Sequence, residues 1–423
     1  MGWVALFVVV GKLAGAGKEM VVAYRFGLRA EVDAYVFVSN LVNWPIAVWM
    51  GVIGVVMVPL AARLRRSSNA DLALFRAELL GLSLVLGTLL AAIASWVLPR
   101  IVGASWTGMP AETAHVALQA VPRFVWVIPF GFAGGVLSML MLASGRHANT
   151  MLEGVPAVVI AGALLVVSDP GIETLVWATV AGGALHVASL ALPLAVRGEV
   201  SWPRFARRSP AWAPFWTGFG ITMVGQALMS LVSIIDQFFA ASLGTGAIAT
   251  LNYAGRMLGL LLGVGATAVG RATLPVFSNL ESRDNAVRDI GSAWVRVMLL
   301  AGILGIGIGW YLAPWGVRIL FERGAFTAAD SVVVCDVFRA SLFQLPFYLA
   351  GLVLVSTLAS RRMYRQIALG AMANVAVKVV ANFCLVPLMG VYGVVTGTVL
   401  MYVVSFGVLW MFASRVGSKG RAL

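Results

Sequence analysis

Charged side chains lie inside long apolar runs of this sequence. The run over residues 3–27, WVALFVVVGKLAGAGKEMVVAYRFG, is long enough to cross a bilayer and still carries two lysines and a glutamate. Each such charge costs a few kcal/mol at the bilayer centre, so it indicates a bundle interior or a hydrated cavity. Lysine and arginine bind phosphates as charged hydrogen-bond donors, and a cavity with several cations and few acids therefore favours an anionic ligand. The residues concerned are Lys12, Lys18, Glu19, Asp236, Arg256 and Lys378.

The composition is typical of an integral membrane protein. Of 423 residues, 61% are hydrophobic and 11% are charged, and a soluble protein of this size carries roughly twice that share of charge. The first apolar segment is too long for a cleavable signal, lysines interrupt it, and no small-residue cleavage site follows it. We therefore expect residues 3–27 to be a retained membrane helix.

The sequence gives little support for redox or metal chemistry. Cys335 and Cys384 fall in apolar segments, where we expect core residues rather than a disulfide or a metal pair. The three histidines are far apart, and the sequence contains no HExxH or CxxC cluster. We expect no metal site and no cofactor.

Twelve membrane spans are predicted from segments of about 20 apolar residues. The fold class is therefore all-α, with about twelve transmembrane helices. The loops between the spans are too short for a catalytic domain, which argues against a membrane glycan polymerase or ligase. The predicted spans are 3–27, 33–61, 77–99, 117–143, 150–168, 173–196, 213–243, 246–276, 288–314, 330–358, 366–387 and 391–413.

Basic residues gather in the loops at one end of these spans. Four such loops are basic: 63–76, 197–210, 281–289 and 361–365. The positive-inside rule then predicts a multi-pass membrane protein with both termini in the cytoplasm. Topology accounts for most of the net charge of +13. We expect no nucleic-acid partner, because the charge is spread over short loops rather than gathered in one basic domain.

The chain repeats itself across two halves. Residues 26–64 resemble residues 243–280: each stretch opens with a bulky residue and a glycine, turns, and continues as one long helix to a proline. Six helices per half insert in the same orientation, and transporters built from such parallel repeats bind substrate between them. We predict two six-helix lobes, 1–200 and 201–423, around a central cavity.

The charges of the first segment divide into two faces of a helix. At 100° per residue, Lys12 and Glu19 share one face. Lys18 and Arg25 share another. We interpret the first pair as self-neutralising and the second as a double positive charge. Three glycines would let a helix or a ligand approach closely: Gly11, Gly15 and Gly17.

Other intramembrane charges have structural interpretations. Asp336 and Arg339 are three residues apart and are expected to pair. Asp33 opens the second span, where the helix dipole favours an acid. Four residues near helix ends are expected to snorkel or cap: Arg123, Glu153, Arg271 and Arg296.

Four stretches of the chain, taken together, resemble a known family. They are GKLAGAGKEMVVAYRFGLRAEVDAYVFV (11–38), LNYAGRMLGLLLGVGATAVGRATLPVFS (251–278), LFERGAFTAAD (320–330) and residues 364–400. Their order and spacing are similar to those of the lipid II flippases, in a superfamily with polysaccharide flippases and multidrug antiporters. The resemblance implies a transporter, not an enzyme, that acts as a monomer in membrane lipid. It would move an undecaprenyl-pyrophosphate-linked glycan precursor to the outer leaflet by alternating access.

The resemblance also assigns site residues. Lys12 and Lys18 occupy positions that are usually arginine in the family, so the charge is kept and the bidentate fork is lost. Asp33 and Arg256 match the family pattern directly. These four residues are the expected substrate-binding set.

Two departures from the family keep alternatives open. The second span reads NWPIAVWMGVIG over 43–54, without the two arginines and the glutamate of the family. A flippase for another lipid-linked oligosaccharide, such as an exopolysaccharide or O-antigen unit, therefore remains an alternative. The chain also has two predicted helices fewer than is common in the family. A multidrug antiporter is less favoured, because a drug cation would prefer an acidic cavity.

A final departure concerns a sodium site that some family members carry. They use an acid on helix seven with an asparagine and a second acid on helix eleven. The matching positions here are Asp236, Asn374 and Lys378. An ammonium in place of the second acid would repel sodium and could pair with Asp236. The hypothesis is that Lys378 is a built-in cation.

Overall fold

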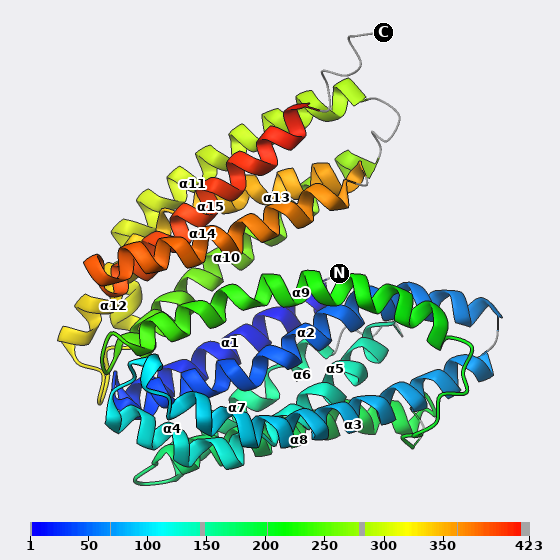
Figure 1. Ribbon diagram of the computed structural model, residues 1–423, viewed down its shortest axis with the longest axis horizontal. Helices are drawn as coiled ribbons and strands as arrows, with labels where there is room; N and C mark the ends of the chain where they lie inside the picture. Colours follow the sequence, from blue (N-terminus) through cyan, green and yellow to red (C-terminus); the bar gives the residue numbers. More distant parts are fainter. Residues whose placement is uncertain are drawn as a thin grey trace. The chain divides into compact units, whose positions relative to one another are not determined.

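A computed structural model describes residues 2–67, 69–143, 149–200, 202–278, 284–361 and 363–415 (Figure 1). These residues form α-helices, one short 3-10 helix and connecting turns, which confirms the predicted all-α class. The α-helices are α1 (Gly2–Phe26), α2 (Ala30–Ser67), α3 (Asn69–Val102), α4 (Ala111–Phe124), α5 (Val127–Ala143), α6 (Asn149–Leu152), α7 (Val155–Val166), α8 (Ile172–Val196), α9 (Trp212–Ala241), α10 (Ala247–Ser278), α11 (Asp284–Leu320), α12 (Ala328–Leu342), α13 (Leu345–Ser360), α14 (Tyr364–Met389) and α15 (Val391–Arg415).

The helices are consistent with the twelve predicted spans. Among the described residues, eight helices are long and apolar enough to cross a membrane, and two bent helix pairs raise this number to ten. The remaining predicted spans correspond to α1 and to α6 followed by the short apolar α7. The chain is therefore a multi-pass membrane protein.

Two compact units make up the chain. The first unit comprises Met1–Gln237 with two short later segments, Gly244–Gly246 and Arg323–Phe326. The second unit comprises Phe238–Leu243, Ala247–Glu322 and Thr327–Leu423. These units are defined by packing, and the division at residue 200 that the sequence repeat suggests stays a prediction.

The fourth predicted span of each half is broken at a proline. Helices α4 and α5 meet at 52°, and α12 and α13 meet at 42°. Pro129 and Pro346 lie in the first turns of α5 and α13, where a residue without an N–H cannot continue the preceding helix. Each proline packs against a glycine of the preceding long helix. A Cβ on Gly87 would lie 2.7 Å from the Cα of Pro129, and one on Gly302 would lie 2.3 Å from the Cα of Pro346.

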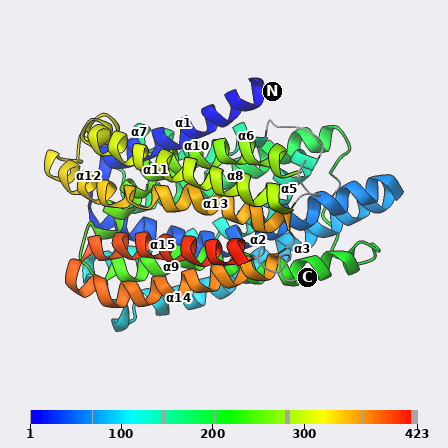
Figure 2. The same cartoon turned by 90° about the horizontal axis from the view of Figure 1, so that it is seen from above.

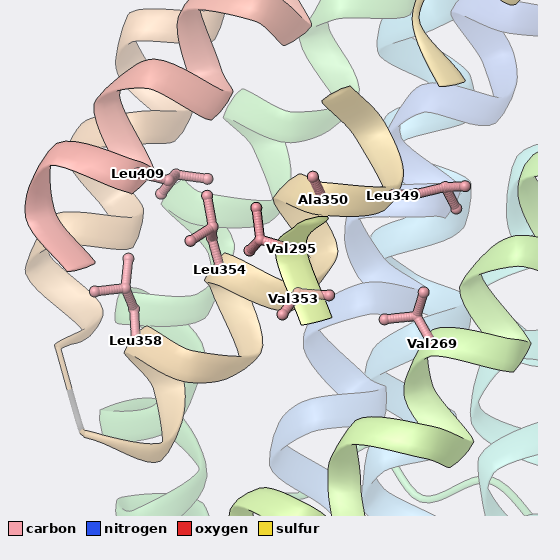
Figure 3. Close-up of a cluster of buried hydrophobic side chains, with 8 residues drawn as sticks. All are labelled: Val269, Val295, Leu349, Ala350, Val353, Leu354, Leu358 and Leu409. Atoms are coloured by element: carbon pink, nitrogen blue, oxygen red, sulfur yellow. The ribbon is translucent and has the colours of Figure 1, made fainter. Parts of the chain in front are cut away.

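Each unit has its own apolar packing. In the second unit, eight buried side chains from α10, α11, α13 and α15 form one cluster (Figure 3): Val269, Val295, Leu349, Ala350, Val353, Leu354, Leu358 and Leu409. In the first unit, aromatic rings gather between α3 and the start of α9: Phe75, Trp212, Phe215, Trp216 and Phe219. Such packing holds the polar residues described below on rigid helices.

Candidate functional site

Lys18 on α1 pairs with the residue next to it. Its Nζ lies 2.8 Å from Glu19 Oε1, and the two side chains are only 13% and 8% exposed. The ammonium also lies 5.8 Å from the centre of the Tyr35 ring, which is within cation–π range. The predicted pairing of Glu19 with Lys12 is therefore wrong. The 100° rule gives the direction of each Cα–Cβ bond only. The lysine side chain is long enough to bend from its own face of the helix to the adjacent Glu19.

Arg25 has a structural role at the end of another helix. Its guanidinium donates to the carbonyl oxygens of Leu164 (3.0 Å), Val167 (3.2 Å) and Ser168 (3.3 Å) at the end of α7. The last carbonyls of a helix have no partner within the helix and attract cations. Lys18 and Arg25 thus have separate partners, and their interpretation as one double positive charge is wrong.

The face of α1 around Lys12 is open. Lys12 and Leu13 are exposed, and a Cβ on Gly15 or Gly17 would meet no atom within 4 Å in the described part of the chain. Gly11 lies close to the start of α7: a Cβ on Gly154 would lie 3.3 Å from the Gly11 Cα. The space beside Gly15 and Gly17 is open within the described residues, and its use by a ligand stays a prediction.

Asp33 is buried, with 1% of its surface exposed. Its Oδ2 accepts a 2.5 Å hydrogen bond from the N–H of Gly246, in the turn between α9 and α10. The contact joins the first turn of α2 to a turn 213 residues later in the chain, inside the first unit. The substrate-binding role of Asp33 stays a prediction, and the contact given by the structure is between two parts of the protein.

Two glycines allow the backbone to approach closely next to this contact. Gly27 and Gly324 have φ values of 58° and 60°, which disfavour other residues. A Cβ on Gly27 would lie 2.5 Å from the oxygen of Ala325, and a Cβ on Gly324 would lie 2.4 Å from the oxygen of Tyr24. The N–H of Ala325 donates to that same Tyr24 oxygen at 2.8 Å. We call Gly27, Asp33, Gly246, Gly324 and Ala325 the turn joint.

Arg256 lies on α10 in the second unit. Its side chain is exposed, and a Cβ on the flanking Gly255 or Gly259 would meet no atom within 4 Å in the described part of the chain. Because α1 belongs to the first unit and Arg256 to the second, a shared site for Arg256 and the lysines of α1 stays a prediction.

Lys378 on α14 is fully buried, with 0% of its surface exposed. Its ammonium donates to the Val394 carbonyl oxygen at 2.7 Å and to Thr398 Oγ1 at 2.5 Å. Both acceptors lie on α15, which runs beside α14 in both views (Figures 1 and 2). One turn before Lys378, the buried Oδ1 of Asn374 accepts no hydrogen bond from any described residue. The ammonium is therefore held by two oxygen atoms of α15.

The remaining predictions have mixed outcomes. Asp336 and Arg339 form the predicted pair, with 3.6 Å between Oδ1 and an arginine nitrogen. Cys335 is buried, as expected of a core residue, whereas Cys384 is exposed, and both are free. Asp236 is half-buried on α9, and its pairing with Lys378 stays a prediction because the two residues belong to different units. The side chains of Arg271 and of the loop at 281–289 lie outside the described residues.

Sequence reasoning missed Glu78 on α3. This carboxylate is 1% exposed and accepts hydrogen bonds from the N–H groups of Arg208 (2.8 Å) and Ser209 (3.1 Å) and from Trp212 Nε1 (2.6 Å). A glutamate near the start of a predicted span was the available signal. Its partners are two backbone groups of the loop between α8 and α9 and the indole of the first residue of α9, which no sequence pattern indicates.

Comparisons with known proteins match this architecture. The sequence model of one family, described as "Lipid II flippase MurJ", matches residues 22–422. The probable lipid II flippase MurJ of Buchnera aphidicola is 21% identical over 362 residues, which cover 83% of this chain and 70% of that protein. The corresponding Vibrio cholerae protein is 24% identical over 77% of this chain and 66% of its own length. The lipid II flippase MurJ of Burkholderia cenocepacia is 26% identical over 91% of this chain and 77% of its own length.

Solved structures show the same fold. A lipid II flippase MurJ in an inward closed conformation superposes with a TM-score of 0.85 at 16% identity, covering 98% of this chain and 88% of that one. An inward-facing multidrug transporter of the MATE family superposes with a TM-score of 0.77 at 15% identity, covering 97% and 96%. At these identities the superpositions establish the fold, and the family model establishes the relationship. This chain belongs to the lipid II flippase MurJ family, whose members are membrane transporters rather than enzymes.

Proposed function

We propose that this chain carries lipid II from the inner to the outer leaflet of the bacterial inner membrane by alternating access. The observation that carries the proposal is the open, basic face of α1 in a chain that the lipid II flippase family model matches over residues 22–422. A lipid-linked pyrophosphate could enter such a site from the side while its tail stays in the bilayer. In parallel-repeat transporters the two halves then rock about the bound substrate.

Lys12, Lys18 and Arg256 are the proposed ligands of the pyrophosphate. The pairing of Lys18 with Glu19 at 2.8 Å supports this role in a specific way. It holds the ammonium in one position and neutralises it while no substrate is bound, which limits the cost of a buried charge. An arriving pyrophosphate would compete with Glu19 for the same donor, and lysine, unlike arginine, offers it a point charge rather than a planar fork.

The turn joint is the proposed element that opens and closes during transport. It ties the α1–α2 turn to segments that follow α9 and α11 in the chain, through Asp33 and the facing glycines. Movement of one sequence half past the other would have to break the Asp33–Gly246 bond. This placement favours conformational control by Asp33 over direct contact with substrate.

Lys378 is the proposed substitute for a bound sodium ion. Its Nζ, held by a carbonyl and a hydroxyl oxygen of α15, leaves no room for a metal ion between the same oxygens. We infer that transport by this chain does not depend on sodium. Both termini would lie in the cytoplasm, and the chain would act as a monomer.

Another lipid-linked oligosaccharide is the second candidate substrate. The observation in its favour is the uncharged second span, in which Trp49 is buried, stacks on Phe132 with ring centres 5.1 Å apart and donates to the Phe132 carbonyl oxygen. Packing therefore occupies part of a region where the family carries charges. A smaller or differently charged head group would suit such a cavity.

The test is leaflet exposure of lipid II in cells whose sole flippase is this chain. Wild type should expose lipid II, and Lys18→Ala and Arg256→Ala should each lower exposure about tenfold or more, because a hydrogen bond to a charged group is worth about 1.5–3 kcal/mol. Lys18→Arg is the matched control and should retain transport. An inserted wild-type chain that exposes no lipid II would reject this substrate and favour another lipid-linked oligosaccharide.

A further inference from the structure

The loop between α8 and α9 combines exposed aromatic rings with a local excess of positive charge. Residues 202–209 read WPRFARRS, with three arginines and no acid. Trp202 is 90% exposed and Phe205 is 75% exposed. The side chains of the three arginines are exposed as well. In water, two aromatic rings left this open would be unfavourable, whereas at a bilayer surface Trp and Phe insert beside the head groups.

The backbone of this loop is nevertheless firmly held. The N–H of Arg204 donates to the Ala77 oxygen of α3 at 2.9 Å, and the oxygen of Arg204 occupies the space that a Cβ on Gly81 would fill. Further along, the buried Glu78 carboxylate accepts both backbone N–H groups of Arg208 and Ser209. Charge-assisted hydrogen bonds of this kind are among the strong ones. The backbone of the loop is therefore fixed against α3, and we call these contacts the held frame of the loop.

The position of the loop places these side chains at a membrane surface. Helix α8 ends at Val196 and α9 begins at Trp212, so the loop connects the ends of two spans. Trp212 Nε1 donates to Glu78, and the Arg207 guanidinium lies 5.7 Å from the ring centre of Trp216 on α9. These contacts keep Arg207 and the loop close to the first turns of α9, and we expect the end of a membrane helix to lie near the lipid head groups.

We propose that residues 202–208 form a binding surface for anionic phospholipid head groups. The rings of Trp202 and Phe205 set the depth of the loop, and Arg204, Arg207 and Arg208 bind the lipid phosphates. Basic residues next to membrane helices attract anionic lipids electrostatically, with about a fivefold effect for each charge near the surface. Glu78 is a positioning residue in this proposal. The proposal does not depend on which substrate the chain transports.

The experiment uses the full chain in phosphatidylcholine vesicles that contain a trace of spin-labelled phosphatidylglycerol or of equally labelled phosphatidylcholine. The fraction of label immobilised by the protein gives the preference for the anionic lipid. The wild type should prefer phosphatidylglycerol, and Arg204→Gln/Arg207→Gln/Arg208→Gln should lower this preference at least about fivefold. Raising the salt to about 1 M shortens the screening length to about 3 Å and should weaken the wild-type preference in the same direction.

Two variants on α3 sharpen the result. Arg100→Gln removes an exposed arginine that stacks on Trp96 at the other end of the same helix, and it should leave the preference unchanged. Glu78→Gln removes one negative charge, and it weakens the hydrogen bonds that hold the backbone of the loop. If only net charge determined lipid binding, Glu78→Gln would raise the preference for phosphatidylglycerol. If the loop must be held in place to bind lipid, the preference should fall.

Two outcomes would overturn the proposal. The first is an unchanged preference in the triple arginine variant, which would mean that these side chains serve another partner, such as an acidic protein. The second is a raised or equal preference in Glu78→Gln, which would reject the held frame. Because the three arginines are exposed, the triple variant keeps the test valid even if Glu78→Gln does not fold.

Discussion

Two lysines inside this membrane protein are handled in opposite ways. Lys18 on α1 is 13% exposed, pairs with an adjacent glutamate and stands near an open helix face. Lys378 on α14 is completely buried and donates to uncharged oxygens of α15. A carboxylate partner can exchange its donor for another anion that arrives. The carbonyl and hydroxyl oxygens that accept from Lys378 belong to α15 itself and carry no net charge, so they hold the ammonium in place within the packed helices. The first arrangement suits ligand binding, and the second suits a fixed structural charge.

The largest expected effect comes from removing the buried ammonium. Lys378→Ala leaves the oxygens of Val394 and Thr398 without their charged donor and opens a cavity between α14 and α15. We expect a loss of about 3 kcal/mol in the free energy of unfolding and a collapse of transport with or without sodium. Thermal unfolding in detergent and lipid II exposure in cells would measure the two effects. Unchanged transport by Lys378→Ala would show that the buried ammonium contributes to stability but is not required for transport.

A change of sign at the same position tests the idea of a built-in cation. Lys378→Asp would place a carboxylate beside the oxygens of Val394 and Thr398, so a bound metal cation should stabilise the site. Added sodium chloride should raise the unfolding temperature of Lys378→Asp, because a ligand that binds the folded state stabilises it. The wild type should not respond, and choline chloride at equal ionic strength is the control. Sodium stimulation of wild-type transport would contradict the hypothesis.

The helical class and the approximate positions of the membrane spans could be predicted because they depend on local composition. Segments of apolar residues with the length of a bilayer appear directly in the sequence, and all twelve predicted spans have helical counterparts. The breaks in the fourth and tenth spans were missed, although Pro129 and Pro346 marked them, because apolar length alone says nothing about continuity.

The partners of the charged residues were harder to predict, for a physical reason. Arg25 binds the end of α7, and Glu78 binds the backbone of a loop about 130 residues away in the sequence. These contacts depend on which helices pack together and on how a long side chain bends, and neither is encoded in helical spacing. Lys378 shows the same limit. Its depth within the span was expected, but its full burial and its acceptors are known only once α14 and α15 are paired.

A smaller effect is expected from the acceptors of Lys378. Thr398→Val keeps the shape of the side chain and removes the hydroxyl that accepts from Nζ, while the Val394 oxygen remains. The free energy of unfolding should fall by about 2 kcal/mol, because a hydrogen bond to a charged group is lost. Transport should persist, since the ammonium itself is still present. Unfolding at the wild-type temperature would indicate that Thr398 contributes little to holding the charge.

The smallest effect concerns the exchangeable partner of Lys18. Glu19→Gln keeps the size of the side chain and removes the charge that neutralises the ammonium. An anionic ligand should then bind about fivefold more tightly, corresponding to about 1 kcal/mol, because it no longer competes with a carboxylate. Titration of the purified protein with a water-soluble pyrophosphate-linked glycan would measure this change. Lys18→Ala/Glu19→Gln should abolish the gain. Weaker binding by Glu19→Gln alone would instead mean that the glutamate orients Lys18 toward the ligand, and that the carboxylate is part of the site rather than a competitor for it.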